Sequence, residues 1–363
     1  MTPEYMFHPQ KPHNRLPLLP SKFNFDTVEI LKQVNLSNIA LAKLNVLAGR
    51  LPESMLLVSP LLVRESVASS EIENINTTVF EVFETEVIPE KDRKGAAKEV
   101  LNYHEAMLTG FELVKKKGFL STNDFVKIQS LAEPSKPGIR KLGVKIVNEL
   151  TQEVLYTAPE GETLVRDLLA NLEEFINNDE DGIDPLVKSA VFHFQFESIH
   201  PFMDGNGRVG RILVILYLIM AKRLDLPVLF LSGYIMKHKK EYYTCLREAN
   251  ETGDFTDVIM FMLKAIEEQA DSTVKTITKI ETLMDEFKMV LSKETNFYSH
   301  ELIQLLFSKP FMTINYLQSG LELSSRQTAS KYLTYMVKLG LFKERAIGKY
   351  KFFYSEVFLK LLS

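Results

Sequence analysis

Twelve consecutive residues, HPFMDGNGRVGR at positions 200–211, combine one histidine, one aspartate, three glycines and two arginines directly before the apolar run ILVILYLIMA. Residues 204–207 predict a turn that enters a helix, where free backbone N–H groups and the helix dipole form a seat for an anion. Arg208 and Arg211 are three positions apart and share a helix face, so their guanidinium groups can reach successive phosphates. The spacing therefore favours binding of a polyphosphate.

The same stretch supplies a base and a metal ligand. His200 is its only base near neutral pH and can take a proton from an attacking hydroxyl. Asp204 offers oxygen ligands to the Mg²⁺ that accompanies a polyphosphate. The alternative is structural: His200 and Asp204 stabilise a helix start, and the arginines are surface charges. The grouping of acid, base and cations around one glycine turn favours the ligand site.

A second alternative is a dinucleotide-binding loop. Gly205, Gly207 and Gly210 have the required spacing, and Asp225 follows at a suitable distance. That loop must follow a strand within a βαβ unit. Here the preceding segment begins with Asp184 and a proline, which predict a helix cap and first turn, so this interpretation is rejected.

The whole chain has an ordinary globular composition. It has 363 residues, of which 45% are hydrophobic and 25% charged, and a net charge of -4 that predicts neither nucleic acid nor an anionic membrane as the main partner. The single cysteine, Cys245, excludes an intrachain disulfide and favours a reducing compartment, which we expect to be the cytoplasm. The apolar run 212–221 is too short to span a membrane.

Apolar spacing predicts a mainly helical chain with two exceptions. Runs 144–147 and 154–157 predict a β-hairpin. From about residue 295 the order is helix, a second helix capped by Thr313, a third led by Ser324, and a β-prone tail around Gly348. This order is typical of a winged helix-turn-helix.

Residues 200–211 match every fixed position of His-Pro-Phe-x-Asp-Gly-Asn-Gly-Arg-x-x-Arg, so the chain resembles the Fic domain family. Upstream, SSEIEN at 69–74 is similar to the family's inhibitory pattern, Ser/Thr-x-x-x-Glu-Gly/Asn. Downstream, KEYYTCLREAN at 240–250 resembles the segment that closes its adenine and ribose pocket. The resemblance covers roughly residues 1–270.

The resemblance implies a Fic helical-bundle core with one β-hairpin flap and an appended winged-helix domain. The expected divisions are an N-terminal region with the inhibitory helix at about 60–75 (1–105), the core with the flap at about 144–157 (106–270), a helical linker (271–294) and the winged-helix domain (295–363).

The implied activity is transfer of AMP from ATP, with Mg²⁺, to a Ser, Thr or Tyr hydroxyl of a target protein docked on the flap, or of the chain itself. His200 is then the catalytic base, and Asp204 the magnesium ligand. Asn206, Arg208 and Arg211 are assigned to the α-, β- and γ-phosphates. The expected nucleotide-binding residues are Asp204, Gly205, Asn206, Gly207, Arg208, Gly210, Arg211, Tyr242, Tyr243 and Asn250. Adjacent tyrosines on a helix cannot both face one way, and Tyr242 is preferred for stacking on adenine.

The upstream match implies that Glu73, with Ser69, inhibits the enzyme by pairing with Arg211 in place of the γ-phosphate. A solvated helical Glu73 is the plain alternative. Two other functions stay open: a hydrolase that removes AMP and uses Glu73 as the base for water, and a nucleotide-sensing regulator that binds DNA. The DNA candidates are Ser324, Ser325, Arg326, Gln327, Ser330 and Lys331, with Arg345, Lys349 and Lys351 on the wing. A homodimer also stays open, and no membrane partner is expected.

Overall fold

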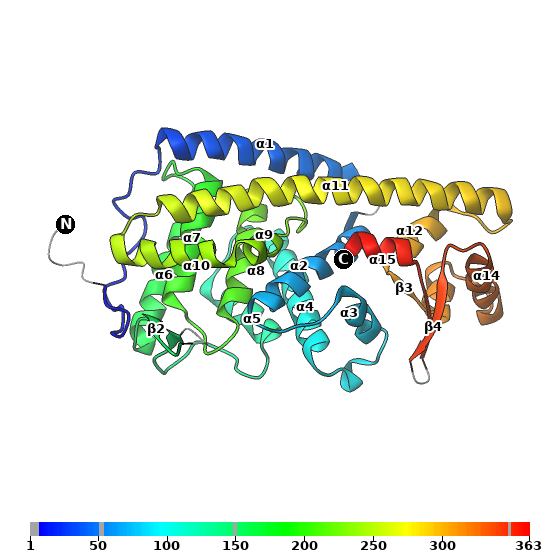
Figure 1. Cartoon of the computed structure of the whole chain (residues 1–363), viewed down its shortest axis with the longest axis horizontal. Helices are drawn as coiled ribbons and strands as arrows, with labels where there is room; N and C mark the ends of the chain where they lie inside the picture. Colours follow the sequence, from blue (N-terminus) through cyan, green and yellow to red (C-terminus); the bar gives the residue numbers. More distant parts are fainter. Residues whose placement is uncertain (1–6, 51–53, 148–150, 348–349) are drawn as a thin grey trace.

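The computed structural model describes residues 7–50, 54–147, 151–347 and 350–363, and these are mainly helical, as the sequence predicts (Figure 1). The helices are α1 (Val28–Arg50), α2 (Ser54–Ile72), α3 (Val79–Glu86), α4 (Ala96–Lys117), α5 (Thr122–Ala132), α6 (Glu162–Asn177), α7 (Pro185–Ile199), α8 (Asn206–Met220), α9 (Ser232–Lys237), α10 (Lys239–Thr252), α11 (Thr256–Glu294), α12 (His300–Ser308), α13 (Ile314–Gly320), α14 (Arg326–Lys338) and α15 (Glu356–Leu362). The strands are β1 (Lys145–Val147), β2 (Val154–Thr157), β3 (Phe311–Met312), β4 (Lys343–Ile347) and β5 (Tyr350–Tyr354).

Helices α7 and α8 form the centre of the core and carry the 200–211 motif between them. The Asp184 carboxylate accepts a hydrogen bond of 2.8 Å from the Leu186 N–H, which caps α7 as predicted. Both helices are buried along almost their whole length. A helix buried all round carries apolar residues on every side, so the alternating phenylalanines of α7 do not require a strand.

Helix α11 packs along α1 and runs from the core to the C-terminal part (Figure 1). The expected linker 271–294 is therefore the second half of one helix of 39 residues. The expected boundary at 105/106 likewise lies inside α4. Each helix carries one continuous apolar face, so neither boundary falls in a loop.

Helix α2 begins earlier and ends earlier than predicted. It contains Pro60 in its interior, so it does not begin at about residue 60 as expected. Proline removes one helical hydrogen bond, but burial of neighbours such as Val58 and Leu61 outweighs that loss. Because α2 ends at Ile72, Glu73 lies in the following turn, not on the helix.

The predicted hairpin is present as the antiparallel pair β1 and β2, although residues 148–150 lie outside the described residues. The Tyr156 hydroxyl donates to the Ser198 carbonyl over 2.7 Å and ties β2 to α7. The N-terminal arm lies against the same strand, because the His13 N–H donates to the Thr157 carbonyl over 3.0 Å. Phe7 stacks on Tyr156 with ring centroids 5.9 Å apart.

The C-terminal part contains α12, β3, α13, α14, β4 and β5, with the strands ordered β3-β5-β4. The expected order of three helices and a terminal hairpin is present, and the winged helix-turn-helix assignment stays a prediction. Thr313 caps α13 as predicted, whereas Ser325, not Ser324, caps α14. Gly348 and Lys349 lie outside the described residues. Within the described part of the chain, no helix combines the length and the apolar character that crossing a bilayer requires.

Candidate active site

The turn between α7 and α8 is held by its own side chains. His200 ends α7 in the left-handed conformation, with φ 49°, and Gly205 begins α8 with φ 80°. The Asn206 side chain accepts from the Phe202 N–H over 2.9 Å and donates to the Phe202 carbonyl over 2.8 Å. Phe202 is fully buried. In this structure the Asn206 amide therefore fixes the loop, while its own N–H lies in the first turn of α8.

Arg140 fixes the loop from outside and was missed in the sequence. Its Nε donates to the His200 carbonyl over 2.7 Å, and its Nη2 donates to the carbonyls of Ile199 (3.2 Å) and Pro159 (2.5 Å). Its own N–H donates to the Pro201 carbonyl over 2.9 Å. This buried guanidinium joins the base of the hairpin to the candidate catalytic loop.

His200 is oriented as a base. Its Nδ1 lies 3.3 Å from the Glu197 carbonyl, and a carbonyl only accepts, so this contact places the proton on Nδ1 and the lone pair on Nε2. Burial lowers the pKa of His200 to about 4, in spite of opposing contributions from Glu73 and Asp204. The imidazole is therefore neutral at physiological pH.

Arg211 is fully buried and bound to the segment that carries the inhibitory pattern. Its Nε donates to Ser69 Oγ over 2.9 Å, and its Nη2 donates to the Ser69 carbonyl over 2.8 Å and to Glu73 Oε1 over 3.0 Å. Burial by itself disfavours the charged guanidinium, but the Glu73 carboxylate raises the pKa of Arg211 above its ordinary value. The interpretation of Arg211 as a surface charge is therefore wrong.

The Glu73 carboxylate lies over the first turn of α8. A Cβ placed on Gly207 would collide with Glu73 Oε1 and would lie 3.0 Å from Arg211 Nη1. The carboxylate thus occupies the predicted anion seat. Asn74 follows with φ 62°, a left-handed conformation that asparagine and glycine tolerate best, and this explains the last position of SSEIEN.

Arg208 is also buried, and its acidic partner was missed in the sequence. Glu133 Oε2 lies 2.9 Å from Arg208 Nη2, and Asp204 Oδ1 lies 3.8 Å from it. Burial by itself would raise the pKa of Asp204. The Lys136 ammonium, 2.7 Å from the carboxylate, and Arg208 outweigh burial and lower this pKa. Asp204 is thus a half-exposed carboxylate beside the seat. It fits Mg²⁺, which commonly takes one or two carboxylates together with substrate phosphates.

Gly210 allows α7 and α8 to approach closely. A Cβ at this position would collide with Glu197 Oε1 and would lie 3.2 Å from the Phe196 ring. Within the described residues, Glu197 Oε1 is buried without a hydrogen-bond partner. Burial raises the pKa of Glu197 to about 8, and Arg211 opposes the shift. Glu197 is a third residue of this region, after Arg140 and Glu133, that sequence reasoning missed, because one glutamate on an apolar helix carries no recognisable pattern.

A cavity of about 400 Å³ opens beside this loop and collects residues from distant segments. Its lining is Phe7, Ile146, Leu155, Tyr156, Glu197, Ser198, Lys240, Tyr243, Thr244, Leu246, Arg247 and Asn250. The preferred Tyr242 does not line this cavity: its side chain is 3% exposed and its hydroxyl lies 2.7 Å from His193 Nε2. Tyr243 and Asn250 share the cavity instead, since Tyr242 points into the apolar core.

Comparison with known proteins identifies the class that these features define. The family models described as Fic/DOC family N-terminal, Fic/DOC family, and protein adenylyltransferase SoFic-like C-terminal domain match residues 31–112, 97–218 and 283–358. The chain belongs to the Fic/DOC family, and its C-terminal part is similar to that of SoFic-like adenylyltransferases.

Curated relatives are similar over shorter segments. A probable protein adenylyltransferase of Aquifex aeolicus is 42% identical over 88 residues, which are 24% of this chain and 25% of the relative. The protein adenylyltransferase Fic of Nematostella vectensis is 25% identical over 185 residues, or 50% of this chain and 40% of the relative. The chain thus spans less than half the length of these two relatives.

Among solved structures, a Fic family protein from Desulfovibrio desulfuricans has a TM-score of 0.58 at 25% identity, over 91% of this chain and 96% of that one. Fic-1 from C. elegans has a TM-score of 0.53 at 19% identity, over 70% and 74%, and shows the fold alone.

The lowered histidine pKa values lead to a first prediction. Burial lowers the pKa of His193 to about 3 and that of His200 to about 4, below the ordinary value of 6.5. Between pH 6.5 and 4 the two imidazoles therefore bind protons in the unfolded chain but not in the folded one. The free energy of unfolding should therefore decrease between pH 6.5 and 4. In histidine NMR spectra, assigned with His200→Asn, neither ring should titrate above pH 5. A midpoint near 6.5 for His200 would contradict the assignment.

A second prediction follows from the two tyrosines. Tyr243→Ala removes an aromatic wall of the cavity, and loss of one base–aromatic stack of about 1–3 kcal/mol should weaken binding of a fluorescent ATP analogue by about tenfold. Tyr242→Phe is the matched control and should change binding less than threefold, because its ring faces the core. Equal losses in both variants would show that the cavity does not hold the base.

Proposed function

We propose that this protein is an autoinhibited adenylyltransferase that transfers AMP from ATP to a Ser, Thr or Tyr hydroxyl of a target protein or of itself. The observation that carries the proposal is the position of Glu73. Its carboxylate pairs with Arg211 and covers Gly207, where the helix N-terminus would otherwise receive a phosphate. The names of the similar curated proteins support the same activity.

The chemistry requires a base, and His200 supplies it through Nε2. The target hydroxyl oxygen attacks the α-phosphorus while its proton passes to Nε2. The bond between the α-phosphorus and the bridging oxygen to the β-phosphate breaks, and pyrophosphate leaves. A neutral imidazole is the competent form, and the low pKa of His200 keeps it neutral at physiological pH.

The two buried arginines and the first turn of α8 receive the phosphates in this proposal. Arg208 is assigned to the β-phosphate and Arg211 to the γ-phosphate, as their spacing on α8 suggests. Magnesium, when bound, offsets phosphate charge, and Asp204 is the residue that holds it. While Glu73 remains on Arg211, the γ-phosphate has no place there, so the triphosphate cannot align for attack.

The β-hairpin is the proposed docking site for the target. In the described structure β1 pairs with β2 alone, and Lys145 and Val147 are exposed at its free edge. An open edge binds an extended segment through main-chain hydrogen bonds with little dependence on sequence. Arg140 connects the hairpin to His200, so a docked segment lies near the base.

The DNA-binding alternative receives less support from the hairpin of β4 and β5. Arg345 Nε lies 2.9 Å from Glu84 Oε1, and Lys351 Nζ lies 2.7 Å from Glu344 Oε1. Two of the three cations expected on the wing are thus paired within the chain, and the third, Lys349, lies outside the described residues. Paired cations offer less charge to a phosphate backbone.

A third prediction tests the inhibitory role. Glu73→Gly removes the carboxylate from Arg211, and because a hydrogen bond to a charged group contributes about 1.5–3 kcal/mol, auto-modification measured with labelled ATP should rise at least about tenfold. The double variant with His200→Ala should be inactive, because the base is missing. No rise in the single variant would refute inhibition by Glu73. Loss of AMP removal from a pre-modified target would support the hydrolase instead.

A further inference from the structure

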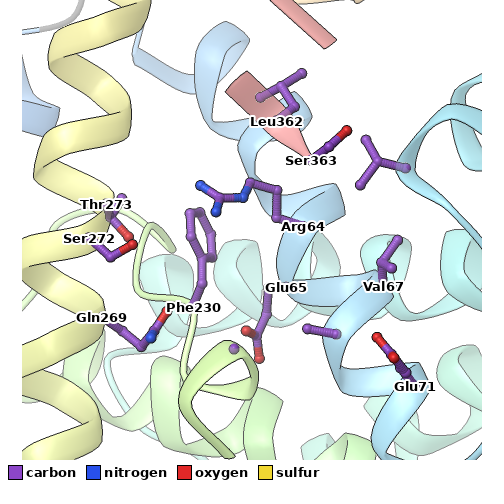
Figure 2. Close-up of a pocket in the computed structure, with 13 residues that line it drawn as sticks. Arg64, Glu65, Val67, Glu71, Phe230, Gln269, Ser272, Thr273, Leu362 and Ser363 are labelled. Carbon is purple, nitrogen blue, oxygen red and sulfur yellow. The ribbon is translucent and has the colours of Figure 1, made fainter. Parts of the chain in front are cut away.

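A second cavity, of about 200 Å³, lies between α2 and α11 (Figure 2). It collects side chains from α2, α11, α15 and the segment before α9. The lining is Arg64, Glu65, Val67, Ala68, Glu71, Val79, Phe230, Gly233, Gln269, Ser272, Thr273, Leu362 and Ser363. The catalytic chemistry described above uses none of these residues.

Arg64 is a mostly buried cation with no acidic partner. Within the described residues its one hydrogen bond is from Nη1 to Thr276 Oγ1, over 3.0 Å, and no carboxylate lies within ion-pair distance. Burial lowers its pKa. Arg208 and Arg211, in contrast, each have a carboxylate within 3.0 Å. Burial of a guanidinium without a counterion destabilises the folded state unless acceptors bind its remaining N–H groups.

The wall of the cavity that α11 forms carries polar side chains that can bind a ligand. Figure 2 shows Arg64 extending from α2 toward Gln269, Ser272 and Thr273 of α11. Among the described residues, these three side chains make no hydrogen bond, although serine and threonine in helices often bond to a preceding carbonyl. The cavity therefore brings together a guanidinium, an amide and two hydroxyls, which is a donor set for a carboxylate.

The acidic and apolar residues that line the cavity limit the class of ligand that it can bind. The Glu65 carboxylate is already bound by the Ser232 N–H, over 3.0 Å, and by the Ser232 hydroxyl. Glu71 is exposed beside the cavity and opposes a second negative charge. Phe230 and Val67 supply an apolar wall. The volume is below the 300–1,000 Å³ typical of sites for drug-sized ligands, so a nucleotide is too large.

We propose that this cavity binds a small monocarboxylate with an apolar body, and that its occupancy changes how firmly α2 holds Glu73 on Arg211. The oxygens of the ligand accept hydrogen bonds from Arg64 and from the hydroxyls of α11. Arg64 and Glu73 are nine positions apart, about 13 Å along a helix, so a shift of α2 reaches both. The effect on Glu73 rests on the proposed function, but binding does not.

Binding is tested by thermal unfolding with butyrate, at an ionic strength kept constant with KCl, and with butylammonium and butanol as probes of matched size. Butyrate alone should raise Tm saturably, by about 2 °C or more, and Arg64→Met should abolish the rise. Arg247→Met is the matched control in the other cavity and should retain it. Equal shifts with all three probes, or an unchanged shift in Arg64→Met, would overturn the site. If Arg64→Met does not fold, Ser272→Ala with Thr273→Val must at least halve the apparent affinity.

A different set of contacts supports a second inference. Helix α3 begins six residues after Glu73, and its Phe80 contacts residues of all three strands of the C-terminal sheet. The Phe80 ring lies 5.0 Å from that of Phe311 and 5.6 Å from that of Tyr354. The Arg345 guanidinium lies 4.9 Å from the Phe80 ring.

Two ion pairs join the same surfaces. Arg345 Nε lies 2.9 Å from Glu84 Oε1, and Lys309 Nζ lies 2.8 Å from Glu86 Oε1. The Glu84 side chain is 19% exposed and that of Arg345 is 50% exposed, so one partner of this pair is largely shielded from water. We infer that the C-terminal part anchors α3 and thereby keeps the preceding turn, with Glu73, at the active site. This inference also rests on the proposed function.

Charge exchange tests the anchor in the full chain. Glu84→Arg and Arg345→Glu should each raise auto-modification at least threefold, because each creates a like-charge pair, and the double variant should return to within twofold of wild type. Lys343→Glu, on the same strand but paired with Glu356, is the control and should leave the rate unchanged. Silent single variants, or a double variant with additive effects, would overturn the anchor. If Glu73→Gly is silent as well, the proposed function fails instead.

Discussion

The buried charge of Arg211 is the constraint on which the arrangement of the active site depends. A guanidinium removed from water must find acceptors for its N–H groups, and here Ser69 of α2 and Glu73 of the following turn provide them. This requirement joins α2 to α8, although 138 residues separate Arg211 from Glu73. A phosphate is also an acceptor for a guanidinium. The contact between Glu73 and Arg211 therefore occupies the position that the proposed function assigns to the γ-phosphate.

The loop before α8 is rigid for a related reason. Its left-handed residues at positions 200 and 205 are not favoured by ordinary sterics, so other contacts must fix them. The Asn206 side chain does so from within, and Arg140 does so from the hairpin side. Both use backbone carbonyls or N–H groups as partners, which leaves the imidazole of His200 oriented by one carbonyl and its Nε2 available. The same contacts therefore support both the fold and the base.

Helix α2 contacts three regions at once, which makes it suited to regulation. One face meets Arg211, another lines the Arg64 cavity, and the helix also packs on α12 and α15 of the C-terminal part. Its end carries a turn fixed by Asn74 in the left-handed conformation. In the proposed regulation a change at any of these surfaces acts on Glu73 through α2, because Glu73 directly follows the end of this helix.

The sequence alone determined the helical class, the hairpin and the 200–211 turn, because these follow from local spacing and backbone preference, and it predicted an anion seat at that turn. It also indicated a link between Glu73 and Arg211 through a short pattern. Tertiary structure decided the features that depend on distant parts of the chain. These are the acid that pairs with Arg208, the carbonyls that bind Arg140, and the tyrosine that faces the cavity. It also set the helix bounds around Pro60 and residue 270. In each case packing between distant segments outweighed a local preference, since burial and pairing of charges depend on neighbours that are remote in the chain.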